Sequence, residues 1–238
     1  MLPREEETQI RLDGDWSSVT AQHMHSALFN SLAVRHKLPD WIRYMSGMSG
    51  RKYRYFINNL VGYMRDPRYL EIGSWKGSTA CAAIWGNRVQ ALCVDNWSQF
   101  LEGGSKEHIR DIFEKNITEA ALNPSDVSWR DQDFRTVSYG DVGKFNVYLF
   151  DGPHEHRDHY DGICMAQPAL DTTHVLIVDD WNNQDVRNGT LAAIQDLKIH
   201  VICEVEIFTR SDNQHPMIAY EHSDWHNGYW MGLVCQSP

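Results

Sequence analysis

From residue 68 onward, short apolar runs alternate with amphipathic stretches, and this alternation limits the chain to few folds. The runs "VYLF" (residues 147–150) and "VLIV" (residues 175–178) have no charged residue at any position. A strand that is apolar on both faces is typical of a buried parallel sheet covered by helices. Repeated strand–helix units connect by right-handed crossovers, so the sequence predicts an α/β fold with a doubly wound sheet.

The predicted elements follow one another regularly along this part of the chain. Strands are expected at residues 68–73, 89–95, 126–130, 145–151 and 173–180. Helices are expected at residues 77–86, 105–122, 134–140, 155–170 and 186–197, with Pro168 breaking the fourth of them. Residues 199–210 and 229–236 read as two more strands, and their helix-free link favours an antiparallel pair at the sheet edge. We predict a Rossmann-like, mostly parallel sheet of about seven strands, with the last one antiparallel.

The N-terminal quarter of the chain has a different pattern. Residues 17–34 and 51–64 carry apolar residues at helical spacing, whereas residues 1–15 are charged and expected to be loose. The sequence therefore predicts two parts, an N-terminal helical extension or cap over residues 1–66 and a catalytic, ligand-binding domain over residues 67–238.

Charge and composition exclude several kinds of partner. The 238 residues carry a formal net charge of −10 and show no cluster of Lys and Arg, which argues against nucleic acid and anionic membrane surfaces. No signal-peptide pattern and no apolar run long enough to cross a membrane is present. The five cysteines lie far apart without a CxxC pair, so we expect free thiols in a reducing compartment. A cytoplasmic protein is the expectation.

The stretch "YLEIGSWKGST" joins the first predicted strand of the sheet to its helix. Gly73 and Gly77 lie in this turn, where bare backbone can approach a ligand and a helix N-terminus offers unpaired N–H donors. The dinucleotide fingerprint GxGxxG is absent, because Trp75 stands where a pyrophosphate would need room. Asp95 ends the second strand, and a carboxylate there can accept hydrogen bonds from both hydroxyls of a ribose. The site suits an adenosine without a pyrophosphate.

The order E-x-G-x-x-x-G followed by an acid at the end of the next strand resembles the class I methyltransferases that use S-adenosylmethionine (SAM). The resemblance implies that Gly73 and Gly77 face the methionine part of SAM and that Glu71 lies near its amino group. It also implies that Asp95 holds the ribose. The remaining residues that it assigns to the cofactor site are Ser78, Gln132, Asp133 and Asp151.

Three aspartates follow two other strands of the predicted sheet. Asp151 ends the fourth strand, and Asp179 and Asp180 end the fifth. Carboxylates that converge without a basic neighbour repel one another, and a hard divalent cation relieves this repulsion. Oxygen ligands favour Mg²⁺, Ca²⁺ or Mn²⁺ over Zn²⁺. In the structural alternative, Asp180 caps the next helix and Asp151 braces the turn at Gly152.

A histidine stands close to the first of these acids. His154 follows Asp151 by three residues, and the ordinary histidine pKa of about 6.5 suits a general base near neutral pH. His156 and His159 are neighbours in sequence that compete for the same role, either as base or as metal ligand.

The stretches "DGPHEHRDHYDGI" and "VLIVDDWN" are similar to the metal-dependent O-methyltransferases of the macrocin type, and more loosely to the catechol O-methyltransferase group. The resemblance covers residues 69–197. It implies Mg²⁺ held by Asp151, Asp179 and Asp180, with His154 as the base. It further implies a hydroxylated small molecule as methyl acceptor, a sugar or a catechol-like diol, and pairing of the chain into a homo-oligomer.

Other functions share parts of this pattern. A nicotinamide-dependent dehydrogenase would use the same sheet and ribose acid, but the missing GxGxxG counts against it. A metal-dependent hydrolase could use the acidic cluster without needing the glycine turn. A catalytically inactive module that binds SAM would keep the fold and lose the reaction.

Overall fold

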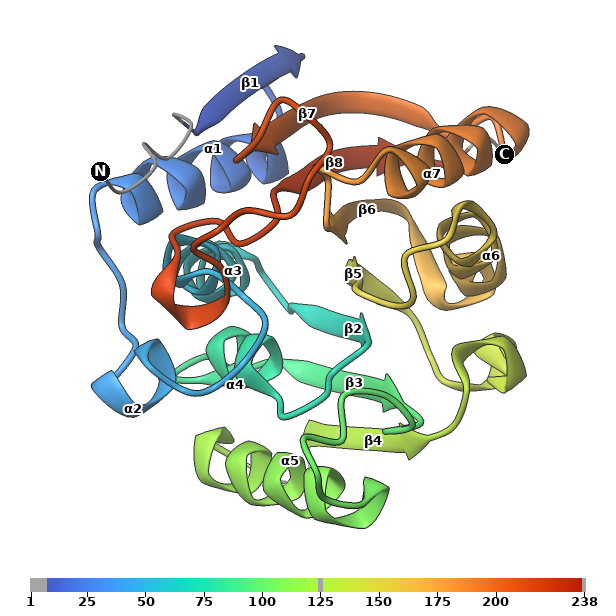
Figure 1. The fold of residues 1–238 in the computed structure, drawn as a ribbon. Helices are drawn as coiled ribbons and strands as arrows, with labels where there is room; N and C mark the ends of the chain where they lie inside the picture. Colours follow the sequence, from blue (N-terminus) through green and yellow to red (C-terminus); the bar gives the residue numbers. More distant parts are fainter. Residues whose placement is uncertain (1–7, 124–125, 237–238) are drawn as a thin grey trace.

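The computed structural model describes residues 8–123 and 126–236 of the 238-residue chain, and these residues form one mixed sheet between two layers of helices (Figure 1). In spatial order the strands are β1 (Gln9–Gly14), β7 (His200–Phe208), β8 (Tyr229–Cys235), β6 (Leu170–Asp179), β5 (Phe145–Phe150), β2 (Arg68–Ile72), β3 (Gln90–Asp95) and β4 (Val127–Asp131). The five strands from β6 to β4 run parallel, and β8 is antiparallel to both of its neighbours. The predicted α/β class is confirmed.

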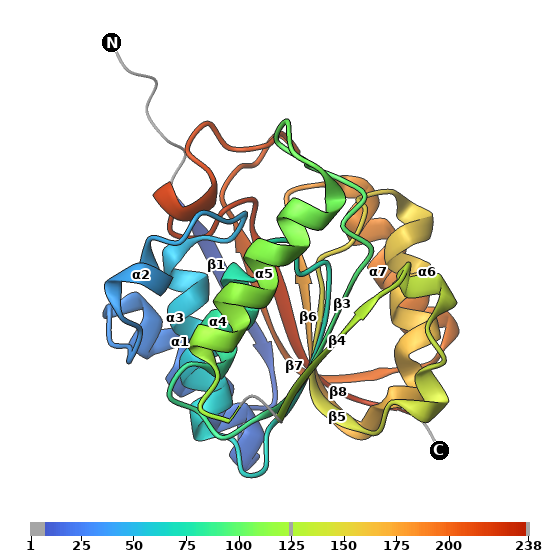
Figure 2. The ribbon, with the colours of Figure 1, turned by 90° about the horizontal axis from the view of Figure 1, so that it is seen from below.

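The helices divide between the two faces of the sheet, as Figures 1 and 2 show. One face carries α1 (Val19–Leu32), α2 (Asp40–Arg43), α3 (Arg51–Tyr63), α4 (Ser78–Ile84) and α5 (Lys106–Ala120). The other face carries α6 (His156–Ala166) and α7 (Gln184–Asp196). Two separate hydrophobic cores fill the spaces between these helices and the sheet.

Strand β5 shows why the central strands are apolar throughout. Val147 and Leu149 belong to the core beneath α3 and α4, whereas Tyr148 and Phe150 belong to the core beneath α6 and α7. Successive side chains of a strand point to opposite faces, so a central strand with helices on both sides must be apolar at every position. Burial of each large side chain contributes about 1.5–3 kcal/mol.

The N-terminal segment departs from the prediction. Residues 9–14 form β1, which pairs antiparallel with β7, although residues 1–15 were expected to be loose; residues 1–7 lie outside the described residues. Alternating charge in this segment hides the pairing, because an edge strand needs backbone partners more than apolar side chains. The division of the chain at residue 66 stays a prediction, since α1 and α3 share one core with the sheet.

The two C-terminal strands form the expected antiparallel pair, but in a different place. Strand β8 lies between β6 and β7 inside the sheet, and β1 covers the outer side of β7. The pair is therefore not the sheet edge that the sequence predicted. The first six of the seven residues of β8, Tyr229 to Val234, are buried, as expected for an inner strand.

The short helix expected at residues 134–140 is instead two separate 3-10 turns, Phe134–Thr136 and Tyr139–Asp141, whereas local signals set the limits of α6. Helix α6 begins with a capping box between Glu155 and Asp158 and ends at Ala166, ahead of a 3-10 turn that contains Pro168. All five cysteines are free thiols. Within residues 8–123 and 126–236, no helix has the length and apolar character needed to cross a membrane.

Candidate active site

A cavity of about 670 Å³ opens where the parallel strands end. Ligands of open α/β sheets bind at this end. Two loops contribute to its walls: the β3–α5 loop (residues 96–105) and the β7–β8 loop (residues 209–228), both visible beyond the strand ends in Figure 2. Among the predicted site residues, those that line the cavity are Gly73, Ser78, Asp95, Gln132, Asp133, Asp151, His154 and Asp180. Those that lie outside its lining are Glu71, Gly77 and Asp179.

The backbone at Gly73 approaches another part of the protein as well as the cavity. Gly73 has φ +86°, and a Cβ atom there would lie 1.7 Å from the carbonyl oxygen of Asp151. Its N–H donates to the carbonyl of Val94 at 2.9 Å. Glycine is required because the chain leaving β2 passes directly beside the chain leaving β5, which brings the two predicted halves of the site together.

Gly77 allows the turn that leads into α4. It has φ +83° and precedes α4, and a Cβ atom there would meet the ring of Phe113 on α5 at 3.0 Å. It lies outside the cavity lining, and its contact with the methionine part of SAM stays a prediction. The next residue, Ser78, does line the cavity, and its hydroxyl lies 3.0 Å from that of Ser49.

Glu71 lies behind the glycine turn, almost fully buried at 1% exposure. The hydroxyl of Tyr69 donates to its Oε2 atom, while Oε1 and the nearby Ser74 hydroxyl approach one another without a well-formed hydrogen bond. Burial raises the pKa of Glu71 to about 7. Two buried polar atoms without a well-formed hydrogen bond are costly, and a cationic group that enters beside Ser74 would relieve that cost.

The Asp95 carboxylate is fixed by the two backbone segments around it. Its Oδ2 atom accepts from the N–H of Trp75 at 2.7 Å, and its Oδ1 atom accepts from the N–H of Trp97 at 2.6 Å. Burial raises the pKa of Asp95, and these two hydrogen bonds oppose the rise. Each carboxylate oxygen keeps a second lone pair, so Asp95 can still accept hydrogen bonds from a ligand in the cavity.

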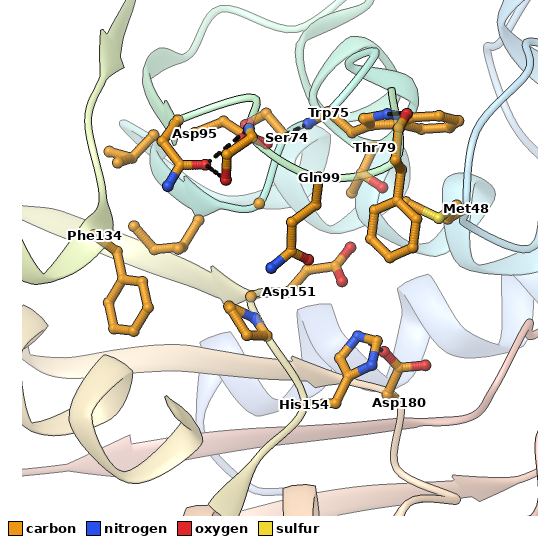
Figure 3. A pocket seen from close by; sticks show the side chains of 18 of the residues that line it. Met48, Ser74, Trp75, Thr79, Asp95, Gln99, Phe134, Asp151, His154 and Asp180 are labelled. Carbon is orange, nitrogen blue, oxygen red and sulfur yellow. Dashed lines mark hydrogen bonds and ion pairs between the residues drawn. The ribbon is translucent and has the colours of Figure 1, made fainter. Parts of the chain in front are cut away.

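Gln132 and Asp133 line the cavity just after β4. Asp133 also caps a 3-10 turn, where its Oδ1 accepts from the N–H of Arg135 at 2.9 Å. The neighbouring Phe134 was not singled out from the sequence. Figure 3 shows its ring on the Asp95 side of the cavity, away from Asp180, where it offers a flat apolar surface.

A second group of polar side chains occupies the opposite side of the cavity (Figure 3). Ligand atoms of Asp151, His154 and Asp180 all lie within 4.8 Å of one another. The Nε2 atom of His154 is 2.7 Å from Oδ2 of Asp180, and the Nδ2 atom of Asn227 donates to Oδ1 of Asp180 at 2.7 Å. Burial raises the pKa of Asp151 well above its usual range, and the charge of Asp180 adds to the rise. Ionisation of Asp151 is therefore unfavourable unless a further positive charge enters beside it.

Asp179 is the one predicted metal ligand that the structure places outside this cluster. It is 2% exposed, and its Oδ1 atom accepts from the N–H of Asp180 at 2.7 Å. Its side chain also forms a hydrogen bond with Asp151, so Asp179 contacts the cluster from the buried side. The left-handed backbone of Asp180, with φ +60°, directs its carboxylate toward His154.

His154 was expected to be a neutral imidazole that can accept a proton, but its contact with Asp180 favours the protonated form. Its hydrogen bond to Asp180 raises the pKa of the imidazole to about 9, so the side chain is a cation at neutral pH. Of its two competitors, His159 is buried outside the cavity, where burial lowers its pKa to about 3, and His156 is exposed at the first residue of α6.

Several cavity residues come from segments that were not predicted to be functional. Met48 belongs to the link between α2 and α3, and Gln99 and Phe100 belong to the β3–α5 loop. The β7–β8 loop, predicted only as a polar link, supplies Asn213, His215, Tyr220, His226 and Asn227. The sequence feature that could have marked this loop is the stretch "HSDWHNGYW" (residues 222–230), which is rich in histidine and aromatic residues.

Residues 70–181 match the family model described as a methyltransferase domain. The matched span runs from β2 to the residue after Asp180, so it includes both the glycine turn and the acidic cluster. This match bears out the prediction of a methyltransferase.

Solved structures share the fold of this methyltransferase at low sequence identity. The SAH-bound methyltransferase PaMTH1 from Podospora anserina has TM-score 0.56 and 12% identity, covering 95% of this chain and 90% of that one. The O-methyltransferase TomG from Streptomyces achromogenes, in complex with SAM, has TM-score 0.52 and 14% identity, covering 90% of each chain.

A larger protein also contains this fold. TrmN from Thermus thermophilus matches with TM-score 0.50 and 10% identity, covering 77% of this chain, which spans 48% of that protein. Curated proteins give no match to the sequence. At these identities the structural likeness shows the fold alone.

Proposed function

We propose that this methyltransferase moves a methyl group from SAM to a hydroxyl of a small molecule, with help from a divalent cation and with His154 as the base. The observation that carries the proposal is the single cavity that joins the Gly73 turn to the Asp151–His154–Asp180 cluster. A donor held at the turn and an acceptor held at the cluster would meet within one enclosed space. Alignment of the reacting groups is the main requirement of an in-line displacement.

The residues around the glycine turn fit SAM. The Glu71 Oε1 atom and the Ser74 hydroxyl, which lack a well-formed hydrogen bond, suit the amino group of its methionine part. Asp95 suits the ribose hydroxyls, and Gln132 and Phe134 suit the adenine. Structures of PaMTH1 with SAH and TomG with SAM support the same cofactor class.

The acidic cluster fits a hard divalent cation, Mg²⁺, Ca²⁺ or Mn²⁺. Asp151 and Asp180 supply carboxylate oxygens with no Lys or Arg ion pair to either among the described residues, and such oxygens are the preferred ligands of these ions. When bound, SAM supplies the methyl group and the cation lowers the pKa of the acceptor hydroxyl. Asp179 would support Asp180 through its hydrogen bond.

His154 would serve as the base only after it leaves Asp180. Competition by a cation for the Asp180 carboxylate would weaken their contact and return the pKa of His154 toward its ordinary range. The side chain is 46% exposed and free to turn toward an acceptor. In the reaction the acceptor oxygen gains the methyl group, the sulfonium becomes the neutral thioether of SAH, and the hydroxyl proton leaves through His154.

The small-molecule acceptor is supported by the size and enclosure of the cavity and by the described role of TomG in tomaymycin synthesis. A cytoplasmic location and pairing into a homo-oligomer remain predictions. The absence of nucleic-acid and membrane partners also remains a prediction, which is supported by the net charge of −10.

Isothermal titration of SAM into the purified protein, with and without Mg²⁺, tests the proposal. We expect micromolar binding that Asp95→Ala weakens at least tenfold, whereas Asp185→Asn, an exposed acid on α7, leaves binding unchanged. Absence of binding in both conditions would overturn the assignment of the cofactor site.

Methyl transfer to a panel of hydroxyl compounds is the second measurement. SAM binding without transfer to any of them would favour a catalytically inactive SAM-binding module. Full activity in excess chelator would remove the cation from the mechanism, and hydrolysis of an ester or phosphate substrate without SAM would favour the hydrolase.

A further inference from the structure

The β7–β8 loop places three aromatic rings at the cavity, on the side of the acidic cluster. His215, Tyr220 and His226 all line the cavity. The rings of Tyr220 and His226 are stacked with centroids 5.3 Å apart, and the ring of His215 meets that of His226 edge-on at 5.1 Å. The three rings therefore form one aromatic wall beside Asp180.

His226 is the most firmly held member of this wall. Its N–H donates to the Ser223 hydroxyl at 2.9 Å, and its carbonyl accepts from the Thr209 hydroxyl at 2.9 Å. The backbone N–H of Tyr220 donates to its ring atom Nδ1 at 3.0 Å. The side chain is 5% exposed. Three hydrogen bonds from different parts of the loop fix both the position and the orientation of the imidazole.

These contacts determine which ring nitrogen carries the proton. A backbone N–H can only donate, so Nδ1 of His226 must accept and has no proton. The neutral imidazole then carries its proton on Nε2. Burial lowers the pKa of His226 to about 4, which keeps the ring neutral under ordinary conditions.

The Nε2–H group is left without a hydrogen-bond partner in the described part of the chain. It points toward Oδ1 of Asp180, but the 3.9 Å separation is too long for a hydrogen bond. That oxygen already accepts from Asn227 at 2.7 Å, and Oδ2 of the same carboxylate faces His154 at 2.7 Å. The Nε2–H of His226 therefore faces the cavity as a donor without a partner among the described residues. It lies close to the acidic cluster, where the acceptor hydroxyl is proposed to react.

We propose that His226 determines acceptor specificity by donating its Nε2–H to the oxygen next to the hydroxyl that is methylated. The proposal rests on the proposed function of the acidic cluster. It assigns the acceptor to vicinal diols carried on a ring, since the second oxygen meets His226 while the ring lies against Tyr220 and His215. His226 positions the acceptor and does not remove its proton, which is the proposed role of His154.

Two substitutions separate this role from a purely structural one. His226→Asn keeps an oxygen near the position of Nδ1, so it can still accept from the Tyr220 N–H, but it removes the donor at Nε2. His226→Gln places an N–H donor near the position of Nε2. His222→Ala is the matched control, because this histidine of the same loop is 77% exposed and lies outside the cavity lining.

The experiment compares diols with their mono-hydroxyl counterparts. Catechol is paired with phenol, and cis-1,2-cyclohexanediol with cyclohexanol, so that the planar and saturated rings are also distinguished. KM and kcat are measured with SAM and Mg²⁺, and acceptor binding to the SAH-loaded protein is measured by calorimetry. SAM affinity is measured for every variant, which separates failure of the cofactor site from failure of this inference.

We expect the wild-type protein to prefer at least one diol over its mono-ol by roughly tenfold, the size of one good hydrogen bond. His226→Asn should remove that preference mainly through KM and acceptor binding, with SAM affinity within twofold. His226→Gln should restore part of it, and His222→Ala should leave it unchanged. Normal SAM binding combined with no diol binding, or with an equal preference in wild type and His226→Asn, would overturn the inference.

Discussion

Glu71→Gln should change how the stability of the protein depends on pH. Burial raises the pKa of Glu71 from 4.5 to about 7. In the unfolded chain the carboxyl loses its proton near pH 4.5, whereas in the folded protein it keeps the proton up to about pH 7. The unfolded state therefore binds fewer protons across this window, and the free energy of unfolding falls as pH rises.

The magnitude follows from the two pKa values. One pKa unit corresponds to about 1.36 kcal/mol, so ionisation of Glu71 in its buried position costs the fold about 3 kcal/mol in full. About 2.5 kcal/mol of this cost develops between pH 5 and pH 8. A glutamine carries no charge at any of these pH values, so the free energy of unfolding of Glu71→Gln should not show this decrease. Acids that do not interact with Glu71 contribute equally to both proteins and cancel in the comparison, whereas the charge of Asp95 adds to the rise in the pKa of Glu71.

Urea unfolding at pH 5, 6, 7 and 8, followed by tryptophan fluorescence without SAM, measures the effect. The difference in unfolding free energy between Glu71→Gln and wild type should grow in favour of the variant by about 2.5 kcal/mol from pH 5 to pH 8. Glu119→Gln, on the exposed side of α5, should give a constant difference. Parallel profiles for Glu71→Gln and wild type would refute the reasoning. The same variant should bind SAM more weakly, because it loses the proposed partner of the amino group.

The other predictions concern the turn and the acidic cluster. Gly73→Ala should lower the melting temperature far more than Gly143→Ala, since both glycines have positive φ but only Gly73 would place a Cβ against backbone, at a cost above about 2 kcal/mol. Equal shifts would show that the close approach is unimportant. His154→Ala should lower kcat at least a hundredfold and leave the Kd for SAM within twofold; a large loss of SAM affinity would contradict its role as base. Asp180→Asn should abolish the dependence of activity on Mg²⁺, and Asp179→Asn should weaken it less, because only Asp180 lies in the cluster. Titration of Mg²⁺ into both variants checks this order.

Local sequence patterns were enough to predict most of the fold and half of the site. The apolar runs of β5 and β6 identified the parallel sheet, because a strand covered on both faces has no polar positions. Gly73 and Asp95 could be placed at strand ends because a strand–turn–helix unit positions its own residues. The β1 strand escaped prediction, since its pairing with β7 joins segments almost 200 residues apart and requires no apolar pattern.

The geometry and charge of the acidic cluster could not be predicted from the sequence. The acids could be assigned to strand ends, but the choice of Asp180 over Asp179 depends on a left-handed backbone conformation that no sequence pattern signals. The charge on His154 depends likewise on its 2.7 Å contact with Asp180. Electrostatic effects of this kind depend on distance and burial, which exist only once the chain is folded.

The sequence by itself determined the alternating α/β architecture, the strand ends that carry polar residues and the class of chemistry. The tertiary structure decided which of those residues meet in one cavity and what surrounds them. Asn227 and His226 reach Asp180 across more than 40 residues of sequence, and Gly73 is fixed by the carbonyl of Asp151 on another strand. Periodicity reports how a segment is buried, whereas the partners of a buried polar atom depend on how distant segments pack together.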